Sequence, residues 1–139
     1  SGGLEIVHLG DPSAPFLAAE ADKICGVPAL DLEGTRAYLV ESTCSGRQRS
    51  VVALDLERPW WPEELGAVTL QVYNPSDIEV RGAKAFVTDA GYPTGVQAAL
   101  WTVDFGGEAP MPLAKVGLPG SATAVSLLGR HALVALGRS

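Results

Sequence analysis

The 139 residues carry a formal net charge of −6, with 47% hydrophobic and 19% charged residues. This composition indicates a chain that folds around a buried core rather than a disordered one. The acidic balance argues against nucleic acid as a partner, because Lys and Arg supply that affinity, and no apolar run approaches the ~18 residues of a membrane span. We therefore expect no nucleic-acid partner and no membrane insertion.

The chain opens on Ser-Gly-Gly, and residues 1–3 are expected to be a cloning remnant or a cut end. A single domain is expected over 4–139. Its first two strands are predicted at about 4–9 and 16–21, on either side of the turn sequence GDPSAP. Proline cannot donate to a strand ladder, so the strand after this turn is expected to be an outer one.

A hairpin pattern follows and recurs three times, centred on Gly34, Gly82 and Gly129, at separations of 48 and 47 residues. Before each glycine, two apolar residues flank a polar one, which is the period of two of a β-strand. After each glycine comes a strand that is apolar on both faces, with the sequences AYLV, AFVT and ALVA. Two strands around a glycine-containing turn predict a β-hairpin.

A second segment also recurs, as IVHLGDPSAP at 6–15, ALDLERPWWP at 53–62 and TVDFGGEAPMP at 102–112. Each copy is a strand with an acid near its end, followed by a turn rich in proline. Asp55 and Asp104 occupy this acidic position, and His8 replaces them in the first copy. The expected role of the two acids is capping of backbone N–H groups in the turn, rather than a ring of carboxylates that binds cations.

The two segments together give four strands in a unit of about 47 residues, which is typical of a β-propeller blade. The predicted fold class is all-β, a β-propeller of four-stranded repeats with three blades' worth of strands. Complete sets are predicted at about 27–69 and 77–118, and terminal strands at 122–128 and 131–136. The units are 24–72, 73–120, and 4–21 combined with 122–137. The alternative is a single β-sandwich whose self-similarity is accidental.

These stretches resemble the repeats of the bacterial LVIVD-type proteins, whose units run through a "vVDvsdP…P" strand and turn and a "vsGxyAYva" hairpin. The resemblance covers nearly the whole chain through IVHLGDPSAP, ALDLERPWWP, TVDFGGEAP, EGTRAYLV, RGAKAFVT and GRHALVA. It departs from the pattern at His8 and at Arg58, where "DP" is broken. The resemblance implies a secreted or surface-anchored β-propeller, and therefore an extracellular or bacterial cell-surface location.

Three blades are fewer than the four to eight of natural propellers. An open ring exposes apolar faces and strand edges, so the chain is expected to be part of a larger or shared ring. Two arrangements remain open. Either two chains join head to tail into a ring of six blades, or the remaining blades lie on another polypeptide.

Cys25 and Cys44 flank the first predicted hairpin, nearly opposite each other across its ends. Such a position is within reach of a disulfide bridge. The predicted disulfide favours an oxidising compartment, and the alternative is two free thiols in a cytosolic protein.

Four residues are candidates for binding a partner. Trp60 and Trp61 are adjacent in a turn, where both cannot face one core, so one indole is expected to be exposed. The favoured interpretation is structural: the indole caps the gap between blades or fills the seam between two copies. The alternative is that it stacks on a sugar or anchors a protein. Glu41 and Asp89 form a matched acidic pair just after the second strand of the first two hairpins. A solvated strand end is the expected position, and a central channel or opening loop is the alternative.

The chain contains no nucleophile elbow, phosphate-binding loop, dinucleotide fingerprint or metalloprotease motif. His8 and His131 fall on different repeats, and position 131 is expected to be an exposed turn site. We predict no catalytic residue, metal or cofactor. The predicted function is a non-catalytic module that presents loops to a protein or glycan partner. The alternative is a fragment of a larger propeller enzyme whose catalytic residues lie on missing blades.

Overall fold

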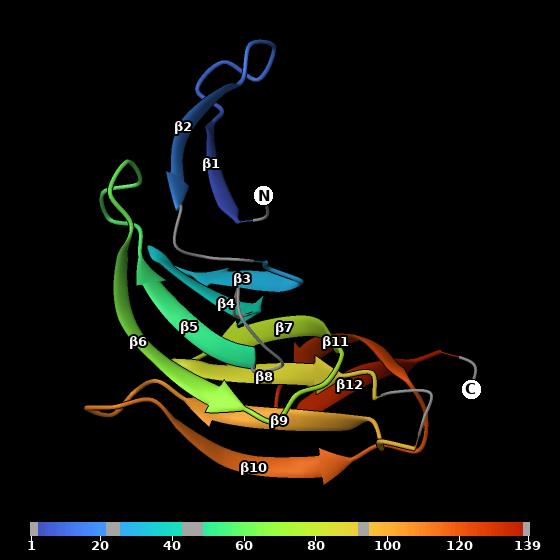
Figure 1. The fold of residues 1–139 in the computed structure, drawn as a ribbon. Coiled ribbons are helices and arrows are strands. Elements are labelled where there is room, and N and C mark those ends of the chain that lie inside the picture. Colours follow the sequence, from blue (N-terminus) through green and yellow to red (C-terminus); the bar gives the residue numbers. More distant parts are fainter. Residues whose placement is uncertain (1–2, 22–25, 43–48, 92–94, 138–139) are drawn as a thin grey trace.

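A computed structural model describes residues 3–21, 26–42, 49–91 and 95–137. These residues form twelve strands and no helix, so the predicted all-β class is confirmed. No described helix is therefore long and apolar enough to cross a membrane. Figure 1 shows the strands as four separate sheets that follow one another along the chain.

Two sheets have four antiparallel strands each. Sheet I contains β3 (Ala29–Glu33), β4 (Arg36–Ser42), β5 (Arg49–Asp55) and β6 (Glu63–Leu70), paired in chain order. Sheet II contains β7 (Pro75–Arg81), β8 (Lys84–Asp89), β9 (Ala99–Asp104) and β10 (Met111–Gly117), also paired in chain order. The two complete sets of four strands are thus where the repeat predicts them.

Two sheets have only two strands each. The N-terminal pair consists of β1 (Leu4–His8) and β2 (Phe16–Ala21), and the C-terminal hairpin of β11 (Ala122–Leu128) and β12 (His131–Leu136). By the repeat, β1 and β2 correspond to the third and fourth strands of a sheet. Likewise, β11 and β12 correspond to the first and second strands.

The glycines that define the repeat sit in the two-residue turns of the three hairpins. Gly34, Gly82 and Gly129 have φ angles of 61°, 59° and 56°, in the left-handed region that L-residues avoid. No atom lies within 4 Å of a Cβ built on any of the three, so backbone conformation rather than crowding requires glycine. The tight turns fix the register in which each hairpin pairs.

The main core lies between sheets I and II. Its buried side chains come from strands of both sheets and the segment joining them, and they are Tyr38, Val40, Val51, Ala53, Leu70, Val72, Ile78, Val80, Ala85, Val87 and Val103. Trp101 packs against this core, with Lys115 Nζ 4.9 Å from its ring centroid. The first strands β3, β7 and β11 lie next to one another, so the sheets follow in a row.

The opposite face of sheet I is covered much less. Ala37, Leu39, Val52 and Leu54 form a second small core there, against which Leu4 of β1 packs. Leu32 stands opposite Ala37 on this face and is 56% exposed, whereas its repeat equivalent Val80 is 9% exposed. The period of two turns the apolar residues of β3 toward this less covered face, where Leu30 is 49% exposed as well. A whole sheet covers Val80, but only a two-stranded pair stands beside β3.

Candidate functional site

The acidic position at the end of the third strand caps the turn that follows, as predicted. Asp55 Oδ1 accepts a hydrogen bond from Glu57 N at 2.8 Å, and Asp104 Oδ1 accepts one from Gly106 N at 2.8 Å. His8 replaces the acid and its function, since its Nδ1 accepts from Gly10 N at 3.1 Å. The three residues are thus equivalent in the fold although their chemistry differs.

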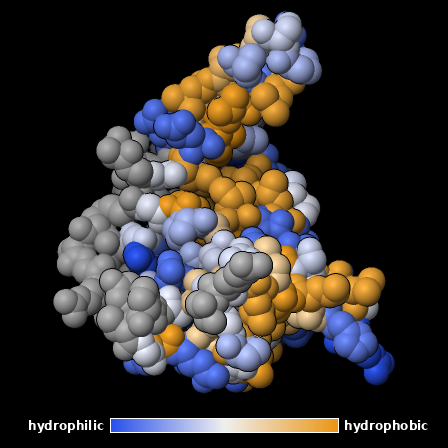
Figure 2. All heavy atoms as spheres, turned by 90° about the vertical axis from the view of Figure 1, so that its right-hand side faces the viewer, coloured by the Kyte–Doolittle hydropathy of each residue, from blue (hydrophilic) through white to orange (hydrophobic). Residues whose placement is uncertain are grey.

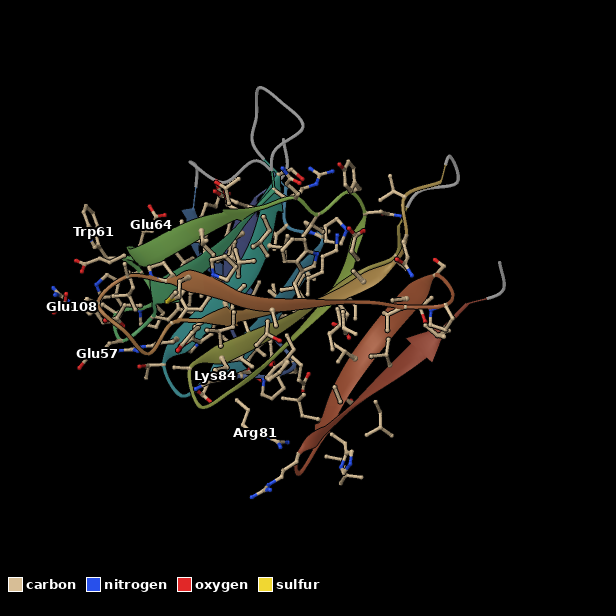
Figure 3. All side chains as sticks on the ribbon, turned by 90° about the horizontal axis from the view of Figure 1, so that it is seen from below. Glu57, Trp61, Glu64, Arg81, Lys84 and Glu108 are labelled. Carbon is tan, nitrogen blue, oxygen red and sulfur yellow. The ribbon has the colours of Figure 1, made fainter. Side chains whose placement is uncertain are left out.

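The two adjacent tryptophans lie in the turn between β5 and β6. Trp60 is 68% exposed and Trp61 is 67% exposed, so both indoles face solvent where one was expected to. The turn is closed by a hydrogen bond from Trp61 N to Arg58 O at 2.9 Å. In Figure 3, Trp61 points outward on the edge of the molecule that also carries Glu64 and Glu108. The turn thus presents two exposed indoles.

The matched acids Glu41 and Asp89 have different surroundings. Asp89 is 2% exposed and its carboxylate accepts three backbone N–H groups, from Tyr73 at 3.0 Å, Asn74 at 2.9 Å and Gly91 at 3.0 Å. Both of its oxygens therefore hold the chain segments at this end of sheet II. Glu41 is half-buried on β4, and burial raises the pKa of its carboxyl. The expected solvated strand end is therefore wrong for Asp89, which is buried because three backbone N–H groups surround its carboxylate. A binding role for either residue stays a prediction.

Cys25 and Cys44 lie outside the described residues. The predicted disulfide between them therefore stays a prediction.

Charged side chains on the first strands connect each sheet to the turn of the next. The Glu33 carboxylate accepts hydrogen bonds from Gly82 N at 2.7 Å and Ala83 N at 2.8 Å, both in the β7–β8 turn. One repeat later, the Arg81 guanidinium donates to Leu127 O at 3.0 Å and Gly129 O at 3.1 Å of the C-terminal hairpin. Figure 3 shows Arg81 directed toward that hairpin.

Further bonds from the same strands reach the edge of the next first strand that pairs with no other strand. Asp31 Oδ2 accepts from Val80 N at 2.7 Å, and Asp77 Oδ2 accepts from Val125 N at 2.9 Å. Glu79 lies in the same region, where burial, followed by the charges of Asp31 and Asp77, raises the pKa of its carboxyl. We call these contacts of Asp31, Glu33, Asp77 and Arg81 the intersheet bonds.

Sequence reasoning missed the intersheet bonds. A signal was present, because the residue before the turn glycine is charged in two repeats, Glu33 and Arg81, and apolar in the third, Leu128. Both side chains bind the hairpin turn of the next sheet. The carboxylate of Glu33 accepts from backbone N–H groups, whereas the guanidinium of Arg81 donates to backbone carbonyl oxygens. Leu128 can do neither, and it is 66% exposed.

The strands at the two ends of the row have unpaired edges. Among the described strands, β1 pairs with β2 alone and β12 pairs with β11 alone. We call the free edge of β1 and the free edge of β12 the closing edges. Large apolar side chains are exposed beside them, namely Val7, Phe16, Leu17, Leu128, Leu133 and Leu136. Apolar surface is prominent over the N-terminal pair in Figure 2.

The described residues contain no group of three or more His, Cys, Asp or Glu side chains that could hold a metal ion. His8 and His131 lie in different sheets, and both are exposed, so the predicted exposure of position 131 is confirmed.

No family model, curated protein or solved structure matches the chain. The resemblance to LVIVD-type repeats therefore stays a prediction.

Proposed function

We propose that this chain is a non-catalytic β-propeller module that associates with a second copy of itself to close a ring. Sheets I and II would be complete blades, and the C-terminal hairpin of one copy and the N-terminal pair of the other would form a shared blade. Two chains would then give six blades, within the range of natural propellers.

The observation that carries the proposal is the unequal burial of equivalent strands. The β4 side chains from Ala37 to Val40 are buried, whereas on the equivalent β12 Leu133 is 52% exposed. Burying a Leu or Val side chain contributes about 1.5–3 kcal/mol. A strand with this pattern gains most when a third strand pairs with its free edge, and β1 is the strand that the repeat assigns to this place.

The row of first strands also supports a propeller. Adjacent β3, β7 and β11 are bridged by the intersheet bonds at sequence separations of 46 to 50 residues. Each sheet thus contacts the next through the same strand, as blades do around a central axis. A closed ring also removes the strand edges that otherwise favour uncontrolled association.

The partner of the closed ring would contact its loops. The exposed Trp60 and Trp61 offer apolar surface with polar N–H groups, which suits a glycan or a protein. An extracellular or cell-surface location goes with this role and with the predicted disulfide.

The mass in solution tests ring closure. Sedimentation equilibrium of the chain at neutral pH should give a mass of twice 14.4 kDa. A mass of 14.4 kDa at micromolar concentration would overturn the two-copy ring.

Fluorescence tests the loop role separately. Titration with a glycan panel should quench Trp60 and Trp61, and the quenching should be lost in a Trp60→Ala, Trp61→Ala variant that keeps Trp101. Unchanged emission across the panel would argue against a glycan partner and leave a protein partner.

A further inference from the structure

The register within the shared blade follows from the complete sheets. In sheet I, Arg36 of β4 stands opposite Asp55 of β5, and in sheet II, Lys84 of β8 stands opposite Asp104 of β9. The repeat equates β12 with β4 and β8, and β1 with β5 and β9. The same register places His131 of one copy directly opposite His8 of the other.

The neighbouring pairs in this register are apolar. Ala132 would stand opposite Val7, and Leu133 opposite Ile6, just as Ala85 stands opposite Val103 in sheet II. The histidine pair therefore takes the one place in the ladder where both complete sheets carry a cation and a carboxylate. Directly opposite residues have Cβ atoms about 4.5–5.5 Å apart, and like charges at this separation destabilise the pair.

The ring of His8 makes two contacts within the N-terminal pair and its turn. Its Nδ1 accepts the hydrogen bond from Gly10 N and its ring stacks on Phe16 of β2, with ring centroids 4.9 Å apart. A proton on Nδ1 would remove the acceptor for Gly10 N. The charged group in the same turn is Asp11, whose carboxylate accepts hydrogen bonds from Ser13 and whose pKa these bonds lower.

The surroundings of His131 are cationic. Arg130 precedes it in the turn, and Arg81 of the adjacent sheet donates to that turn. Leu128, opposite His131 on β11, has no charge. In the closed ring, the next sheet after the shared blade is sheet I of the copy that supplies the N-terminal pair. The β3–β4 turn of that sheet, with Glu33 and Arg36, would lie beside the His131 end of the C-terminal hairpin, as the β7–β8 turn lies beside β3. Glu33 is engaged with Gly82 N and Ala83 N, so it leaves little compensation for two imidazolium ions.

Resting on the proposed ring closure, we propose that the shared blade is an acid-sensitive interface between two copies, with His8 of one facing His131 of the other. The ladder closes when the two imidazoles carry no charge. Imidazole gains its proton between about pH 8 and pH 5, so acid places two positive charges opposite each other at both shared blades. The ring then opens into single chains.

The experiment measures the dimer dissociation constant by sedimentation at about pH 8 and about pH 5.5. For the natural chain the constant should rise about tenfold or more at the lower pH, since two like-charge pairs form. The matched variant is His8→Asp with His131→Lys, which copies the Lys84–Asp104 pair of sheet II. Its dissociation constant should change less than threefold over the same range, and circular dichroism at both pH values verifies that each chain stays folded.

The outcomes separate the two proposals. A natural chain of 14.4 kDa at both pH values overturns ring closure and the acid-sensitive interface with it. A dimer whose dissociation constant does not change with pH leaves ring closure standing and overturns the histidine pair. A double variant that dissociates in acid as the natural chain does also overturns the histidine pair, because another group must then drive opening.

Discussion

Strands β4 and β12 carry the same kind of sequence and have opposite surroundings. The run AYLV of β4 is buried between β3, β5 and the two cores, whereas the run ALVA of β12 pairs on one side with β11 and is largely exposed. Composition therefore does not decide burial in this molecule. What decides it is whether a third strand pairs with the free edge and a neighbouring sheet covers the face.

The third strands repeat this lesson. Val51 to Leu54 of β5 are buried, whereas on the equivalent β1 Val7 is 47% exposed. Both two-stranded sheets thus show apolar surface that the repeat buries elsewhere. Substitutions at equivalent positions in complete and incomplete sheets measure this difference directly.

The largest difference in stability is expected between substitutions of Asp89 and of its repeat equivalent Leu136. Asp89→Ala leaves three backbone N–H groups without their acceptor and should lower the free energy of unfolding by about 3 kcal/mol. Leu136→Ala, on an exposed strand, should cost about 1 kcal/mol or less at a dilution that keeps single chains. Urea denaturation of both variants provides the measurement. Equal losses would contradict the assignment of Asp89 to the sheet II framework.

The second-largest difference is expected between a valine in a complete sheet and a valine in a two-stranded one. Val87 is fully buried, and Val87→Ala should lower the free energy of unfolding by about 2 kcal/mol, because two methyl groups leave the core and a cavity stays behind. Val134→Ala at the equivalent place on β12 should cost less than about 1 kcal/mol in dilute solution. If the ring closes, the cost at Val134 rises with protein concentration, and a cost that ignores concentration would contradict closure.

The strand order and the hairpins could be predicted because local sequence determines them. Gly34, Gly82 and Gly129 set three identical turns, and the alternation before them and the apolar runs after them mark strands without knowledge of the rest. The caps at Asp55 and Asp104 were equally predictable, since a short side chain reaches a backbone N–H two residues away.

The intersheet bonds and the burial of each strand could not be predicted in the same way. Glu33 and Gly82 are 49 residues apart, and only the relative position of two sheets brings them together. Leu32 has the sequence pattern of Val80 and lacks its cover. Asp89 and Glu41 share a repeat position. Two of the three N–H groups that donate to Asp89, those of Tyr73 and Asn74, nevertheless lie in the segment between sheets I and II. These properties depend on which sheet packs beside each strand. A repeat pattern in the sequence does not show what packs against its first and last units.

A smaller effect is expected at the intersheet bonds. Glu33→Leu copies the residue that the third repeat carries as Leu128, and it removes the acceptor of two N–H groups in the β7–β8 turn. The free energy of unfolding should fall by about 1 kcal/mol, since water replaces part of the lost hydrogen bonding. The reverse change, Leu128→Glu, should alter it by less than about 0.5 kcal/mol in dilute solution, because none of the described sheets follows the C-terminal hairpin. A comparable response from both variants in urea denaturation would show that the bonds contribute nothing specific to the contact between sheets I and II.

The smallest effect concerns Glu79, which the third repeat replaces with Ser126. Burial, together with the charges of Asp31 and Asp77, raises the pKa of Glu79 above its ordinary value, so the folded chain holds this proton more tightly than the unfolded chain. The contribution of Glu79 to stability is therefore present at acid pH, and it is lost as the pH rises from the ordinary carboxyl range through the raised value. Glu79→Gln removes that loss and should stabilise the chain at neutral pH by about 0.5 kcal/mol or less, because water still reaches this half-buried side chain and screens its charge. Thermal unfolding from about pH 3 to pH 8 should show the gain over the natural chain only above the carboxyl range. A gain of the same size at about pH 3 would mean that packing of the amide, rather than removal of the charge beside Asp31 and Asp77, stabilises the variant.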